Sequence, residues 1–108
     1  MITLYHNPRC SKSRAALQRV QDYAEDRNLA LHIVEYLHNP LNDKQLQALQ
    51  KQLGAQSTAL LRDHEGLTPK QQRDLLVAQP ELMQRPIVSY EGRAVIARPL
   101  ELLDSLLL

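Results

Sequence analysis

Residues 5–14 have the sequence Tyr5-His6-Asn7-Pro8-Arg9-Cys10-Ser11-Lys12-Ser13-Arg14, which sets Cys10, the one cysteine of the chain, between two expected elements. The residues before this segment, from Ile2, have the β-branched and aromatic character of a short strand, and Asn7-Pro8 ends it. After Cys10, apolar residues recur at helical spacing as far as about Arg27. The segment therefore predicts a strand, a thiol and a helix in direct succession.

This position favours ionisation of the Cys10 thiol. A helix N-terminus presents free N–H groups and a partial positive charge, and Arg9 and Arg14 add cationic side chains close by in the sequence. The imidazole of His6 lies four residues upstream. The sequence therefore predicts a thiolate near neutral pH, and the alternative is an ordinary buried core cysteine.

The middle of the chain predicts a second strand followed by two helices. Residues 30–36 are rich in β-branched and apolar side chains, which is typical of a strand. Asn42 and Thr68 are each followed three residues later by glutamine, a helix start signal. The two helices are expected to end near Gly54 and Ala78.

Shorter elements complete the pattern. A short helix is expected at 57–62, a helical turn at 81–84, and a last helix after Pro99. Residues 87–90 and 93–97 flank Glu91-Gly92, which predicts an antiparallel hairpin. This order favours an α/β fold with a mixed four-stranded sheet flanked by helices. We expect a single domain over residues 1–108, with an inserted helical subdomain at about 41–84.

The composition limits the partners and the compartment. A chain of 108 residues with 44% apolar side chains can bury a core without disulfide or metal staples. Lys and Arg number 13 against 12 Asp and Glu, so no bulk charge attracts nucleic acid or a membrane surface. A single cysteine cannot form an internal disulfide, and the N-terminus is too polar for a signal peptide. We therefore expect a cytoplasmic protein with no nucleic-acid or membrane partner.

Five separate motifs, in the same order, resemble the glutaredoxin-coupled arsenate reductase (ArsC) family of the thioredoxin-like superfamily, and most closely its YffB/YfgD-like branch. They are Tyr5-His6-Asn7-Pro8-Arg9-Cys10, Ser13-Arg14, Ala59-Leu60-Leu61-Arg62, Arg85-Pro86-Ile87-Val88 and Ala97-Arg98-Pro99. The resemblance implies a thioredoxin-like fold with Cys10 as the catalytic residue. It also implies a cis peptide bond before Pro86, for which the alternative is a trans proline that begins an edge strand.

The resemblance assigns the oxyanion site to three arginines. Arg62, Arg85 and Arg98, each in its own motif, would bind an arsenate-type oxyanion and the covalent intermediate. Arginine suits this task because its planar guanidinium pairs with two oxygens and stays charged. Arg62 and Arg98 carry more weight in this expectation than Arg85. For each arginine the alternative is a solvated surface role.

The start of the first helix supplies the remaining site residues that the resemblance implies. Its first turn would add N–H groups and positive charge to the oxyanion site through Ser11, Lys12 and Arg14. From its position three residues after Cys10, Ser13 can donate a hydroxyl hydrogen bond to the sulfur, and the alternative is that it only caps the helix. The resemblance implies that protonated His6 stabilises the thiolate by its charge. The alternative for His6 is a hydrogen bond to local backbone.

The implied reaction is attack of the Cys10 thiolate on arsenate, which gives a covalent adduct held by the arginines. Glutathione is the implied co-substrate and a glutaredoxin the implied partner, since no second cysteine is present to resolve the adduct. No bound cofactor is expected. No metal is expected either, because His6 and Cys10 lack further ligands at useful spacing.

Two other classes of protein stay open at this point. A glutathione-dependent thiol transferase acting on mixed disulfides would use the same thiol. A non-enzymatic protein-binding module that resembles Spx is also compatible, although Ser13 replaces the second cysteine usual in that group. A phosphatase-like arsenate reductase is excluded, because it needs arginine six residues after the cysteine, where this chain has Ala16.

Overall fold

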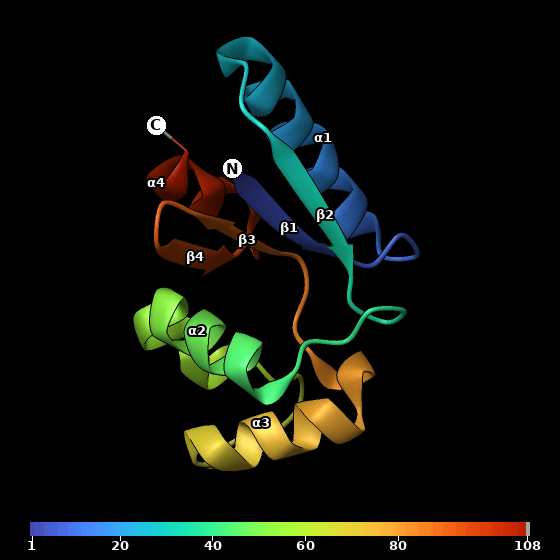
Figure 1. The fold of residues 1–108 in the computed structure, drawn as a ribbon, viewed down its shortest axis with the longest axis vertical. Helices are drawn as coiled ribbons and strands as arrows, with labels where there is room; N and C mark the ends of the chain where they lie inside the picture. The colour runs from blue at the N-terminus through green and yellow to red at the C-terminus, as the bar shows by residue number, and fades with distance from the viewer. Residues whose placement is uncertain (108) are drawn as a thin grey trace.

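A mixed four-stranded sheet forms the middle of the structure, a computed structural model that describes residues 1–107 (Figure 1). Its strands are β1 (Ile2–His6), β2 (Leu31–Glu35), β3 (Ile87–Tyr90) and β4 (Arg93–Ile96). They lie in the order β2-β1-β3-β4. The β1–β2 pair is parallel, whereas the β1–β3 and β3–β4 pairs are antiparallel. The predicted α/β class and the predicted hairpin are both confirmed.

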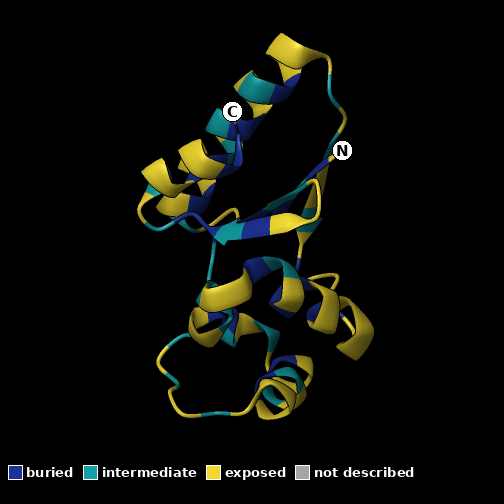
Figure 2. Ribbon diagram, turned by 90° about the vertical axis from the view of Figure 1, so that its left-hand side faces the viewer, coloured by how far each residue is buried: buried dark blue, intermediate teal, exposed yellow. Residues whose placement is uncertain are grey.

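Helices cover both faces of the sheet. One face carries α1 (Ser11–Arg27), η3 (Leu100–Leu102) and α4 (Leu103–Leu106). The other face carries the segments between β2 and β3, which are α2 (Asp43–Leu53), η1 (Gly54–Ala59), α3 (Pro69–Ala78) and η2 (Pro80–Leu82). Figures 1 and 2 show α2 next to the sheet and α3 beyond it. Within residues 1–107, no helix is long and apolar enough to cross a membrane.

Alternation along the strands produces two separate apolar cores. Side chains of one parity, such as Leu4 and Val88, pack against α1 and α4. Side chains of the other parity, such as Ile87 and Ile96, pack against the leucines of α2. Because successive strand residues face opposite sides, each face needs its own helical cover. The segment between β2 and β3 is therefore part of the core of the protein.

Two short elements differ from the prediction, and the difference bears on the site. The expected helix at 57–62 is η1, which ends at Ala59, and the expected turn at 81–84 is η2. An antiparallel bridge pairs Leu61 with Met83 and draws both out of helical geometry. The Arg62 N–H also donates to the Leu82 carbonyl at 2.8 Å. Arg62 and Arg85 are therefore attached to one shared backbone frame.

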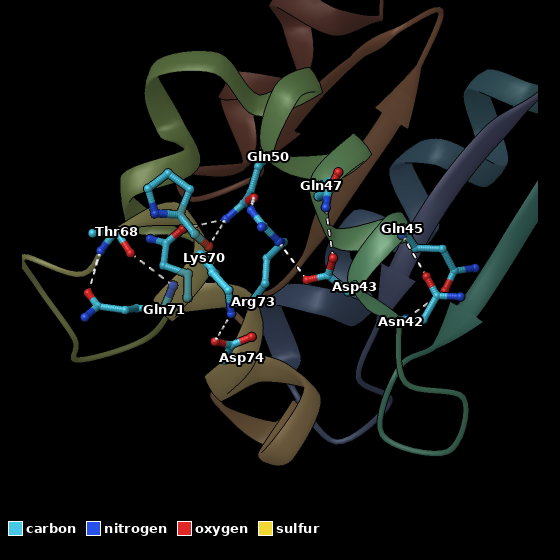
Figure 3. Close-up of polar contacts among 12 residues, drawn as sticks. Asn42, Asp43, Gln45, Gln47, Gln50, Thr68, Lys70, Gln71, Arg73 and Asp74 are labelled. Carbon is cyan, nitrogen blue, oxygen red and sulfur yellow. Dashed lines mark hydrogen bonds and ion pairs between the residues drawn. The ribbon is translucent and has the colours of Figure 1, made fainter.

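A network of polar side chains joins α2 to α3. Gln50 and Gln72 are buried, and Gln50 Nε2 donates to Gln72 Oε1 at 3.0 Å. Gln72 Nε2 donates in turn to the Ser57 carbonyl at 3.1 Å. Figure 3 shows Arg73 between Gln50 and Asp43, with hydrogen bonds of 3.1 and 2.8 Å. This network fixes the outer helix α3 where apolar contacts are few.

Substitution of Gln72 tests this network. Gln72→Leu keeps the volume but removes one of the two hydrogen bonds to the Ser57 carbonyl, which the Leu60 N–H also reaches, and removes the bond from Gln50. We expect the free energy of unfolding in urea to fall by about 1–3 kcal/mol. Lys70→Gln removes only an exposed ion pair with Asp74 and should change little. A loss for Gln72→Leu no larger than for this control would contradict the role of the network.

Candidate active site

The turn between β1 and α1 presents the Cys10 sulfur at the edge of the sheet where β1 ends. The Cys10 N–H donates to the Asn7 carbonyl at 3.0 Å, and the Arg9 N–H donates to Asn7 Oδ1 at 3.0 Å. Cys10 is the N-cap of α1 with extended backbone, and its carbonyl accepts the Arg14 N–H at 3.0 Å. The thiol is partly exposed and is not an inert core cysteine.

The environment of Cys10 favours the thiolate. Burial raises the pKa of its thiol, but the N–H groups of Ser13 and Lys12 and the Arg85 guanidinium outweigh burial, so the net pKa is lowered. This is the ionisation that the sequence predicts for the first turn of a helix.

Arg85 is the arginine whose side chain reaches the sulfur. Its Nε and Nη1 atoms are buried and have no hydrogen-bond partner among residues 1–107. Arg98 Nη1 donates to the Arg85 carbonyl at 3.1 Å and to Gln84 Oε1 at 3.4 Å, so Arg98 lies beside the backbone of Arg85. Arg85, which the sequence analysis weighted below Arg62 and Arg98 as an oxyanion binder, is thus the arginine that reaches the Cys10 sulfur.

Both site arginines next to the hairpin precede cis peptide bonds. The Arg85–Pro86 bond is cis, as the resemblance implies, and the Arg98–Pro99 bond is also cis, which the sequence did not predict. The Ala97 N–H donates to the Pro86 carbonyl at 2.9 Å. The two arginine–proline segments therefore lie side by side at one end of the hairpin.

His6 and Ser13 form a buried pair behind the thiol. His6 is 5% exposed and its Nδ1 lies 2.7 Å from Ser13 Oγ, which also accepts the Asn7 N–H at 3.0 Å. Burial lowers the pKa of His6, the Glu35 carboxylate opposes this, and the Arg14 charge adds to it, with a net decrease. His6 is therefore neutral near pH 7, and the expectation of a stabilising imidazolium is wrong.

The Ser13 prediction also needs correction. Its hydroxyl is shared by His6 and Asn7, and its backbone N–H, rather than its hydroxyl, acts on the Cys10 sulfur. Ser13 is completely buried, so His6 and Ser13 together set the position of the first turn of α1. The pair acts on the thiol by fixing the backbone that carries the N–H groups.

Three further expected residues lie on the exposed start of α1. Ser11 and Lys12 have exposed side chains, and Lys12 acts on the sulfur through its backbone N–H. Arg14 Nη1 donates to the Pro8 carbonyl at 2.9 Å, which ties the helix to the turn. The side chain of Arg14 therefore holds the Cys10 turn closed.

Sequence reasoning missed two residues of the site. Gln84 Oε1 accepts from both Arg98 Nη1 and the Arg85 N–H, at 3.4 and 3.3 Å, and so links the two arginines. Tyr36 is 2% exposed and follows β2 directly. The sequence signal that could have identified Tyr36 is its position one residue after a strand that pairs with β1. Among residues 1–107, no group of three or more His, Cys, Asp or Glu side chains could hold a metal ion.

The Cys10 environment gives a direct prediction for alkylation. The rate of reaction with iodoacetamide should follow pH with a midpoint below the ordinary thiol value of 9.0. Arg85→Gln should move this midpoint upward, because it removes the positive charge beside the sulfur. Arg93→Gln, at an exposed arginine of β4, should leave the midpoint unchanged. A wild-type midpoint at the ordinary value would refute thiol activation.

The lowered pKa of His6 predicts sensitivity to acid. The unfolded chain takes up the His6 proton near pH 6.5, whereas the folded chain takes it up only at lower pH. The free energy of unfolding should therefore fall as pH decreases from 6.5 toward the folded-state pKa, and His6 should contribute no pH dependence above that window. Urea unfolding of His6→Gln should show a flatter pH dependence, whereas exposed His32→Gln should match wild type. Equal slopes in all three proteins would disprove the assignment.

Comparisons with known proteins identify the family of the chain. Residues 5–105 match the model of the ArsC family. An arsenate reductase of Neisseria meningitidis serogroup A is 36% identical over 118 aligned residues, covering 98% of this chain and 97% of the relative. The Escherichia coli K12 protein YfgD is 35% identical over 112 residues, covering 93% and 91%.

Solved structures give the same result. An arsenate reductase from Vibrio cholerae superposes with a TM-score of 0.80 at 29% identity, covering 99% of this chain and 97% of that structure. The YffB protein shares the fold, with a TM-score of 0.73 at 16% identity and complete coverage of both chains. The family match, the relatives and the shared thioredoxin-like fold show together that this chain belongs to the ArsC family.

Proposed function

We propose that this protein is an arsenate reductase-like thiol oxidoreductase in which the Cys10 thiolate attacks an arsenate-type oxyanion. The observation that carries the proposal is the pair of buried Arg85 nitrogens without partners, beside a thiol with a lowered pKa. Buried donors without acceptors are costly, and a tetrahedral oxyanion offers several acceptor oxygens at once. Relatives that cover almost the whole chain carry the name arsenate reductase.

The arginines would solve the electrostatic problem of this reaction. Attack by a thiolate on an anion brings two negative charges together, which fixed positive donors must offset. Arg85 would bind the oxyanion directly, Arg98 would hold the Arg85 backbone in place, and Arg62 would approach from the Leu61–Met83 bridge. The N–H groups at the start of α1 would supply neutral donors from the other side.

The electron balance points to external thiols. Attack forms a sulfur–arsenic bond and releases one oxygen of arsenate as hydroxide, and arsenic remains pentavalent in this step. Reduction to arsenite needs two electrons, and a chain with one cysteine cannot supply them as an internal disulfide. Glutathione as co-substrate and a glutaredoxin would supply the two thiols, which leave oxidised as a mixed disulfide. No bound cofactor is needed, and a reducing cytoplasm suits this chemistry.

A coupled assay tests the proposal. Purified protein is combined with arsenate, glutathione, a glutaredoxin and an NADPH-linked glutathione reductase, and arsenite is measured directly. Cys10→Ser should abolish turnover, and Arg85→Gln should lower kcat/KM by about 10²–10³-fold. Arg93→Gln, on the exposed hairpin, should behave as wild type.

Two results of this assay would contradict the proposal. Reduction of a glutathione mixed disulfide that depends on Cys10, without arsenite, would identify a thiol transferase. Activity on neither substrate would favour a protein-binding role of the Spx-like kind. Thermal unfolding of each variant establishes that a loss of turnover does not come from loss of the fold.

A further inference from the structure

The end of β2 brings Tyr36 to the Cys10 turn. β1 and β2 are parallel, and their last pair is His6 with Glu35. Tyr36 directly follows the end of β2, and Asn7 directly follows the end of β1. Because parallel strands end at the same edge of a sheet, Tyr36 lies beside the turn that carries the thiol.

The Tyr36 ring is buried in the core that also contains residues close in sequence to Arg62 and Arg85. The side chain is 2% exposed and belongs to the core between the sheet and α2. The same core contains Leu61, next to Arg62 in sequence, and Ile87, two residues after Arg85. A ring fixed in this way has one position for its hydroxyl.

The groups around the Tyr36 hydroxyl determine where it can donate a hydrogen bond. The Asn7 side chain is hydrogen-bonded to this hydroxyl, and the charges of Arg85, Arg62 and Cys10 act on it. Asn7 Oδ1 already accepts the Arg9 N–H, so the Asn7 amide nitrogen is the group that faces the phenol oxygen. Burial, the largest influence, raises the pKa of Tyr36, and the phenol therefore keeps its proton at neutral pH.

Among the groups that act on the Tyr36 hydroxyl, the Cys10 sulfur is the one that could accept a hydrogen bond from it. Asn7 donates to the phenol oxygen, and guanidinium groups have no acceptor atoms. The remaining neighbour, the Cys10 sulfur, is stabilised by the N–H groups of Ser13 and Lys12 and by Arg85. An oxygen of a ligand bound over Cys10 would give the hydroxyl a second acceptor for its hydrogen bond.

We propose that Tyr36 is a catalytic residue of this site, whose phenol hydroxyl donates a hydrogen bond to an oxygen of the oxyanion bound over Cys10. The inference deepens the proposed function and rests on it. A neutral donor complements the arginines, because it binds an oxygen without adding charge that would hold the product anion. Asn7 is then a positioning residue, which orients the phenol toward the ligand.

Oxyanion protection of Cys10 tests this role without turnover. The rate of Cys10 alkylation by iodoacetamide is measured against arsenate concentration in wild type, Tyr36→Phe and Tyr5→Phe. Phenylalanine keeps the buried ring, and thermal unfolding establishes that the fold is retained. Tyr5 is the matched control, because it is a partly buried tyrosine that lines a hollow with Thr3 and Gln45 rather than the thiol site.

We expect the arsenate concentration for half protection to rise about 10–100-fold in Tyr36→Phe and to stay at the wild-type value in Tyr5→Phe. The pH midpoint of alkylation without arsenate should be the same in all three proteins, because the thiolate is stabilised by other groups. Equal protection of wild type and Tyr36→Phe would overturn the role of Tyr36 while leaving the proposed function intact. Absence of protection in wild type would overturn the proposed function, and the Tyr36 inference with it.

Discussion

The site depends on one electrostatic constraint, which is that the half-buried guanidinium of Arg85 must face negative charge. Two of its nitrogens are buried without partners among residues 1–107, and beside it lies the Cys10 thiol, whose pKa this cation lowers. Arg85 and Cys10 stabilise each other. The guanidinium lowers the pKa of the thiol, and a thiolate offsets the cost of burying part of the guanidinium. The two unpaired nitrogens could donate hydrogen bonds to a ligand with more than one acceptor atom.

The rest of the fold brings these two charges together from distant parts of the chain. Cys10 comes from the turn after β1, and Arg85 comes from the segment before β3, which pairs with β1. The Leu61–Met83 bridge and the Gln84 N–H bond to the Leu60 carbonyl, at 2.7 Å, connect that segment to the end of η1. The polar network between α2 and α3 then supports the frame from outside, so helices without site residues still determine where Arg85 lies.

The sequence predicted the elements that local rules control. The strand–thiol–helix junction, the two capping boxes at Asn42 and Thr68 and the Glu91-Gly92 hairpin were all confirmed, because each depends on residues a few positions apart. The bridge that shortens the helix expected at 57–62 could not be predicted, since it pairs residues 22 positions apart and overrides helical propensity. The contact of Arg85 with the Cys10 sulfur could not be predicted for the same reason, because it brings together residues 75 positions apart.

The histidine shows why residue type alone misleads about mechanism. An imidazole four residues before a cysteine suggests an ion pair with the thiolate. Burial of His6 beside Ser13 lowers its pKa, so the imidazole lacks the positive charge that such a pair needs. Thiolate formation is therefore assigned to the Arg85 guanidinium and to backbone N–H groups at the start of α1. A nucleophile stabilised in this way keeps its charge when a proton moves at His6. Under the proposed function, the same fixed donors that favour ionisation of the sulfur would also bind the oxyanion.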